Sequence, residues 1–220
     1  MIISNKIVPH SDDQIFLDGH SLKFTNNSMF LGLKLDNKLK FCDHICYIND
    51  KISKLIGIFG RIRENLPTKT RKDYYNCFIF PYISQNIIVW GGTYPTHLTP
   101  LISAHKRMIR LMAGADYLAN TNILFFQLKI LKLTDIYKYF LCIHIFKERL
   151  KGNYCTMHDL STRNRDLAQP VYQRLSQCQH SISFMGPTIW NTLPQDIRSI
   201  DNLKTFKSNL KDYLLNQYAE

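Results

Sequence analysis

Potential metal ligands are concentrated in one short segment, Cys42-Asp43-His44-Ile45-Cys46. Three ligand types within five residues could supply part of a structural zinc site, which needs a second pair of ligands elsewhere in the chain. The available second pairs are Cys155 with His158 and Cys178 with His180, and neither has a convincing ligand spacing. We therefore interpret the segment as helix-start and core residues, and we expect no metal ion.

Catalytic motifs are also missing or isolated. The adjacent carboxylates Asp12-Asp13 could bind Mg²⁺ for phosphoryl transfer, but no third acidic residue accompanies them, and a solvated turn is favoured. There is no G-x-S-x-G, no P-loop and no G-x-G-x-x-G, and a plain loop is favoured for Gly91-Gly92. His105 and His144 lie on or near apolar helix faces, where a structural histidine is more common than a general base. We assign no catalytic residue and no cofactor to this chain.

Basic side chains give the one chemical signal that stands out. The 220 residues include 28 Lys and Arg against 17 Asp and Glu, a net charge of +11. Residues 42–152 hold sixteen of the basic residues and seven of the acidic ones, so they carry nine of the eleven excess charges. Positive charge on rigid helices can bind the phosphates of a nucleic acid, although surface helices commonly carry Lys and Arg on the wet side as well. The candidate phosphate-binding residues are Lys54, Arg61, Lys69, Arg71, Lys72, Lys106, Arg107 and Arg110.

Composition excludes several classes of protein. Hydrophobic residues make up 45% of the chain, which argues against disorder. No apolar run reaches the length of a membrane-spanning helix, and the N-terminus has no signal-peptide pattern. The six cysteines are scattered, which favours reduced thiols. We expect an intracellular protein of the nucleus or cytoplasm, neither secreted nor bound to a membrane.

Hydrophobic periodicity predicts a mainly α-helical fold with a small antiparallel β part at the N-terminus. Short strands are expected at 15–17 and 22–24, on either side of a turn at Asp18-Gly19-His20-Ser21 that is centred on the Asp-Gly pair. A third strand is expected at 29–35, where Gly32 could let another backbone or a ligand approach closely. A strand is also expected at 181–185, followed by a short helical turn at 187–193. The main helices are expected at 43–66, from 68 to a kink at Pro81, from an N-cap at Thr99 to 114, at 122–129, at 134–151 and at 202–217.

A series of short motifs resembles the C-terminal part of reverse transcriptases from non-LTR retrotransposons of the jockey and CR1 type. Phe30-Leu31-Gly32 is similar to the primer-grip element of that family. Downstream motifs follow in the same order: His44-Ile45, Lys51-Ile52-Ser53-Lys54, Leu66-Pro67-Thr68-Lys69-Thr70, Ile87-Ile88-Val89-Trp90-Gly91, Thr162-Arg163-Asn164, Gly186-Pro187 through Trp190-Asn191 to Leu193-Pro194, and Phe206-Lys207 with Leu210.

The resemblance implies three parts: residual palm strands with the primer-grip-like element at 1–41, a thumb-like helical domain at 42–152, and a C-terminal region at 153–220. It also implies a truncated polymerase that is not catalytic alone, because the aromatic-Ala-Asp-Asp turn that binds Mg²⁺ in the parent polymerase is absent from this sequence. The partner would be an RNA or DNA duplex held through its backbone. Apolar faces left exposed could meet the missing palm and fingers or another chain. The alternative is a helical protein-interaction domain, or an inert product, with no nucleic-acid role.

Overall fold

The computed structural model describes residues 15–22, 25–151, 168, 170, 174 and 178–218. Helices dominate these residues, and strands pair only near the N-terminus, in two separate antiparallel hairpins. The mainly α fold with a small N-terminal β part is therefore confirmed. Asp12-Asp13, Cys155, His158 and Thr162-Arg163-Asn164 lie outside the described residues.

Both hairpins turn on a residue pair with positive φ. β1 (Ile15–Leu17) pairs with β2 (His20–Leu22) across Asp18 and Gly19, whose φ angles are 47° and 78°, so the turn lies on the Asp-Gly pair as predicted. The turn is shorter than predicted, because His20 and Ser21 belong to β2, and residues 23 and 24 of the predicted strand lie outside the described residues. The single strand predicted at 29–35 is wrong. The chain reverses at Leu31 and Gly32, with φ angles of 47° and 79°, and divides the segment into β3 (Asn27–Phe30) and β4 (Leu33–Asp36). Glycine adopts positive φ without a steric cost, so Gly32 favours a turn over a continuous strand.

α1 (Cys42–Ile62) is the long amphipathic helix expected from the periodicity. Its buried apolar residues recur every three or four positions along one side, and a 3₁₀ turn, η1 (Arg63–Asn65), follows it. The segment between β4 and α1 is ordered by Asp36, whose carboxylate accepts hydrogen bonds from the backbone N–H groups of Lys38, Lys40 and Phe41 at 2.7–3.0 Å.

The second predicted helix is interrupted just before Pro81, where a kink was predicted. α2 (Thr68–Tyr74) continues into a π-helical segment, η2 (Tyr75–Ile79), and then into α3 (Phe80–Ser84). Pro81 has no N–H to donate to the preceding turn, and the register changes just before it. A short helix that the sequence did not indicate, α4 (Ile87–Trp90), follows.

α5 (Pro95–Ala113) begins earlier than predicted. Pro95, and not Pro100, occupies the first turn, and Thr99 does not cap the helix, because its hydroxyl donates to the Pro95 carbonyl at 3.1 Å. Either proline fits a helix start, so local sequence does not decide between them. The predicted end is confirmed, since Gly114 follows the helix with a φ of 65°.

The remaining helices build the second half of the core. α6 (Thr121–Leu128) and α7 (Leu133–Leu150) match the prediction closely. The strand predicted at 181–185 is wrong, because α8 (Ile182–Asn191) covers that segment after a 3₁₀ turn, η3 (Cys178–His180). α9 (Gln195–Arg198) and α10 (Leu203–Asn216) complete the chain, and the side chain of Asn202 caps α10 by accepting from the N–H groups of Lys204 and Thr205.

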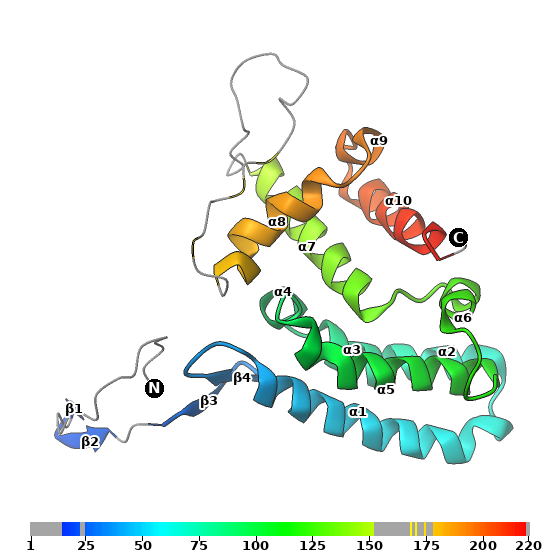
Figure 1. The fold of residues 1–220 in the computed structure, drawn as a ribbon, viewed down its shortest axis with the longest axis horizontal. Coiled ribbons are helices and arrows are strands. Elements are labelled where there is room, and N and C mark those ends of the chain that lie inside the picture. The colour runs from blue at the N-terminus through cyan, green and yellow to red at the C-terminus, as the bar shows by residue number, and fades with distance from the viewer. Residues whose placement is uncertain are drawn as a thin grey trace.

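The helices form successive layers (Figure 1). α1 lies along one edge and packs on α5, which runs beside α2 and α3. α6 and α7 cover the other side of that layer, and α8 and α10 both pack on α7. The two sides of the helical body are therefore the outer face of α1 and the surface formed by α6, α10 and the segment between α6 and α7.

Candidate nucleic-acid interface

The outer face of α1 presents two of the predicted cations. Lys54 and Arg61 are exposed and lie on the side of the helix opposite its buried residues. Arg61 follows Lys54 by seven positions, which is about 10 Å along the axis. Asp50 is exposed on the same side of the helix, so the outer face of α1 carries mixed charge. Its positive charges are directed away from the rest of the protein.

The three predicted cations of α2 have different environments. Lys69 is exposed in the first turn. Arg71 is half-buried, and its guanidinium donates to the backbone carbonyls of Leu66, at 2.9 Å, and Met112, at 3.3 Å. It therefore ties the start of α2 to the end of α5. Lys72 is half-buried and lines a pocket.

The cations of α5 also divide into free and engaged side chains. Lys106 and Arg107 are exposed. Arg110 is half-buried, donates from Nε to the Ala119 carbonyl at 3.1 Å, and lies over the Tyr117 ring at 5.8 Å from its centroid. Arg110 thus holds the loop between α5 and α6. Two of the eight predicted residues, Arg71 and Arg110, have a structural use that sequence position alone did not reveal.

The eight predicted residues do not lie on one side of the protein. The outer face of α1 carries Lys54 and Arg61, whereas Lys72 points toward α6 and α10 on the other side of the α2–α5 layer. A duplex bound along the outer face of α1 would therefore not contact Lys72. Lys106 also lies near that second side, because its positive charge lowers the pKa of Lys132 at the start of α7.

Three further lysines that the sequence did not indicate lie on this second side. Lys129 and Lys132 are the first and last residues of the segment between α6 and α7, and Lys211 comes from α10. Burial lowers the pKa of the Lys132 ammonium, and the positive charges of Lys106 and Lys138 lower it further, against the opposing effect of Asp135. No periodic pattern could have found this group, because its members come from separate helices and meet only through tertiary packing.

The primer-grip-like residues form the tip of the second hairpin. Phe30 is 61% exposed and Leu31 is 77% exposed. Behind them the turn packs on the loop between α3 and α4: the Asn86 side chain donates to the Leu31 carbonyl at 3.3 Å, and a Cβ on Gly32 would lie 2.5 Å from Gln85. Gly32 is closely approached, but by the Gln85 side chain of the same molecule and not by the backbone or ligand that was predicted.

Two histidines are buried as structural residues. His105 Nε2 lies 3.0 Å from the Tyr75 hydroxyl, and burial lowers the pKa of His105 to about 3. His44 Nδ1 accepts from the Lys34 N–H at 3.3 Å, and burial, helped by the charge of Lys34, lowers the pKa of His44 to about 4. Both are therefore neutral near pH 7. Within the described residues no group of three or more His, Cys, Asp or Glu side chains could hold a metal ion.

Comparison with known proteins relates part of this chain to a mobile-element polymerase. Over 125 residues it is 26% identical to "RNA-directed DNA polymerase from mobile element jockey" of Drosophila funebris. The chain carries a region distantly related to a reverse transcriptase. The match covers 55% of this chain and 14% of the length of that relative. No family model matches the chain, and no solved structure does.

Several motifs that resemble the reverse-transcriptase family are packing elements in this chain. Trp90 is fully buried, donates from its indole to the Gln85 carbonyl at 2.9 Å, and meets the His44 ring edge-on at 5.8 Å. A Cβ on Gly91 would lie 2.7 Å from the Tyr137 ring of α7, so glycine is needed for that contact. The W-G pair therefore holds α4 against both the start of α1 and the start of α7.

The downstream motifs have the same character. The Asn191 side chain both donates to and accepts from the backbone of Ala168, each at 2.9 Å. Trp190 is buried beside Phe206, at 5.6 Å between ring centroids, and Phe206 stacks on Phe146 at 4.4 Å. These residues join α8 and α10 to α7.

No helix of the described part is long and apolar enough to span a membrane.

Proposed function

We propose that the chain is a fragment of a non-LTR retrotransposon reverse transcriptase that covers the end of the palm, the thumb and the C-terminal region. We propose that it binds the backbone of a template–primer duplex. Its relation to the jockey polymerase supports the reverse-transcriptase origin. The motif order supports a placement near the C-terminal end of such an enzyme. The thumb-like unit is residues 42–152, which hold most of the excess positive charge and are mainly helical over the described residues 42–151.

The observation that carries the duplex contact is the exposure of cations on rigid helices. Lys54, Arg61 and Lys69 project from α1 and α2, and among the described residues none of the three side chains forms an ion pair within 4 Å. Cations held on helices without an acidic partner can neutralise phosphates and release the counterions around a duplex. Such contacts position a duplex and do not read its sequence.

Equilibrium binding of a DNA duplex and of an RNA–DNA hybrid tests this proposal. Affinity should fall linearly with salt on a log–log plot, with a slope near −0.9 for each phosphate contact on DNA. Binding should be independent of sequence. Absence of binding at about 50 mM salt, or binding that does not respond to salt, would refute the duplex contact.

We further propose that this chain alone does not polymerise DNA, because its sequence contains no aromatic-Ala-Asp-Asp turn. Primer extension with dNTPs and Mg²⁺ tests this directly. Extension by the purified chain that is abolished by Asp12→Ala and Asp13→Ala would contradict the proposal and would assign a catalytic role to that pair.

A second candidate function is docking of another protein surface on the tip of the second hairpin. Met29, Phe30 and Leu31 are 53%, 61% and 77% exposed and adjoin one another, which is an unusual concentration of apolar side chains on so small an element. The absent palm of the parent polymerase is the partner that the resemblance suggests. Phe30→Ser and Leu31→Ser should abolish association with a separately expressed palm, whereas Lys54→Gln and Arg61→Gln should leave that association unchanged.

A further inference from the structure

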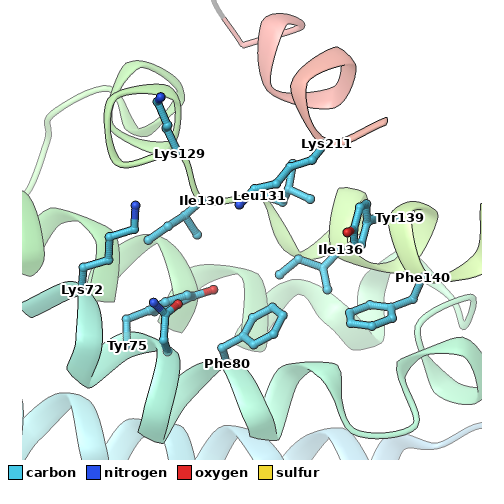
Figure 2. Close-up of a pocket in the computed structure, with 11 residues that line it drawn as sticks. Lys72, Tyr75, Phe80, Lys129, Ile130, Leu131, Ile136, Tyr139, Phe140 and Lys211 are labelled. Carbon is cyan, nitrogen blue, oxygen red and sulfur yellow. The ribbon is translucent and has the colours of Figure 1, made fainter. Parts of the chain in front are cut away.

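A pocket of about 250 Å³ opens between α2, the segment joining α6 to α7, α7 and α10 (Figure 2). Three lysines from three different elements line it: Lys72 from α2, Lys129 after α6, and Lys211 from α10. Figure 2 shows Lys72 at the left of the pocket and Lys129 and Lys211 above it, with the Lys129 ammonium directed upward. Tyr75, Phe80 and Phe140 lie below, and Tyr139 lies at the right. None of its eleven lining residues is acidic.

The lysines of this pocket are not neutralised. Among the described residues no carboxylate lies within 4 Å of any of the three ammonium groups, and none of them makes a hydrogen bond. Burial lowers the pKa of the Lys211 ammonium, and repulsion from Lys72 and Lys129 lowers it further, while Asp212 opposes the change. Cations that repel one another across a pocket favour an anion placed among them.

The floor of the pocket is a row of aromatic rings in mutual contact. Ring centroids are 6.3 Å apart between Tyr75 and Phe80, 6.4 Å between Phe80 and Phe140, and 5.6 Å between Phe140 and Tyr139. Tyr75 is fully buried, but the other three rings keep some exposure, so a planar group could lie against them. Stacking of a base on an aromatic ring is worth about 1–3 kcal/mol, and it tolerates any base.

The local backbone supports a binding role for this wall. Tyr75 begins the π-helical segment η2, and Asn76 belongs to the same segment. A single turn of π-helix changes the direction of the side chains that follow it, and such turns occur frequently at functional sites. The pocket as a whole is lined by one amide, three cations and several rings, which are groups that can contact the base and the phosphate of a nucleotide.

We propose that this pocket binds one nucleotide unit, with the phosphate between Lys72 and Lys211, the positive charge of Lys129 at the rim, and the base against the aromatic floor. The inference goes beyond the duplex contact and does not depend on it, because the pocket faces away from the outer side of α1. Two sources share this chemistry: a free nucleoside monophosphate and the phosphorylated end of a single strand. At about 250 Å³ the pocket is small for a ligand site, so we assign it a single nucleotide and not a longer stretch of strand.

Calorimetric titration of the full chain tests the proposal with three small probes: adenosine 5′-monophosphate, adenosine and inorganic phosphate. The monophosphate should bind at least tenfold more tightly than either part alone, because it uses both the lysines and the rings. A five-nucleotide single strand with a 5′-phosphate is the fourth probe. Tighter binding of the strand identifies its end as the source, and equal binding identifies a free nucleotide.

Two matched variants locate the binding. Lys211→Gln removes a pocket ammonium and should weaken the monophosphate about tenfold, the effect of one charge-assisted hydrogen bond to phosphate. Lys204→Gln makes the same change at an exposed position of the same helix and should leave the affinity unchanged. Phe140→Leu should weaken the monophosphate while leaving inorganic phosphate unaffected. Thermal melting of each variant checks that the fold is retained.

No heat of binding from the monophosphate at millimolar concentration, or equal weakening by Lys211→Gln and Lys204→Gln, would overturn the proposal. Inorganic phosphate binding as tightly as the monophosphate would also overturn it, because the rings would then contribute nothing. The duplex proposal fails separately, since it is tested by substitutions on α1. Lys211→Gln should leave duplex affinity unchanged.

Discussion

Acidification from pH 7 to pH 5 should destabilise the fold through His105. This side chain is buried against Tyr75 and Phe125, and its pKa falls from 6.5 to about 3 because burial penalises the charged form. Between those two pH values the unfolded chain binds a proton that the folded chain does not. The free energy of unfolding therefore rises with pH across this window: the full contribution is present above pH 6.5 and is lost progressively as the pH falls toward 3.

The size of the effect follows from the width of the window. At pH 5 the unfolded-state pKa lies 1.5 units above the pH, and each unit corresponds to about 1.36 kcal/mol, so His105 accounts for a loss of about 2 kcal/mol relative to pH 7. His44, whose pKa is about 4, adds a loss of similar size. Together the two histidines account for about 4 kcal/mol, a large fraction of the stability of an ordinary domain.

Urea unfolding at pH 7 and pH 5, followed by the fluorescence of the two buried tryptophans, measures this loss. His105→Gln removes the titrating group, so the difference between the two pH values should shrink by about 2 kcal/mol, whatever the absolute stability of the variant. Ile109→Val, at a neighbouring buried position, is the matched control and should keep the full difference. If His105→Gln shows the same difference as the wild type, His105 is not held neutral by burial and the reasoning is refuted.

Three other substitutions test how the helices are joined. Phe206→Ala should lower the free energy of unfolding by about 3–5 kcal/mol, because it leaves a cavity beside Trp190; urea unfolding measures this, and a loss below 1 kcal/mol would contradict the packing. Tyr218→Phe should cost about 1.5–3 kcal/mol, because the Tyr218 hydroxyl donates to the buried carboxylate of Asp135 at 2.6 Å; a neutral effect would mean that this bond does not anchor the C-terminus. Gly91→Ala should cost about 1–3 kcal/mol through overpacking against α7, and an unchanged melting temperature would exclude that close approach.

Local signals predicted the long helices well where apolar stripes and end residues agree, although α5 begins at Pro95 and not after the predicted N-cap Thr99. Gly114 ends α5, and Asn202 caps α10, for reasons that lie within a few residues. Prediction failed where neighbours in space decide the outcome. The alternating segment at 181–185 could form a strand, yet it is helical in α8, where Gly186 packs against Ile145 of α7.

The candidate interface could be predicted only in part. Exposed cations on one helix, such as Lys54 and Arg61, follow from the helical period. The engagement of Arg71 with the end of α5 does not, because its acceptor at Met112 is 41 residues away in the sequence. The pocket lysines could not be grouped from sequence either, because Lys72 and Lys211 meet only after α2 and α10 have packed around α6 and α7.

Salt-dependent binding of a duplex by paired variants tests the central claim most directly. Lys54→Gln with Arg61→Gln should reduce the magnitude of the log–log salt slope by about 1.8, because two phosphate contacts are lost at about 0.9 each. Lys204→Gln with Lys207→Gln removes the same charge from α10 and should leave the slope unchanged. An identical slope for both pairs and the wild type would show that the outer face of α1 does not bind a duplex, and it would contradict the proposed function.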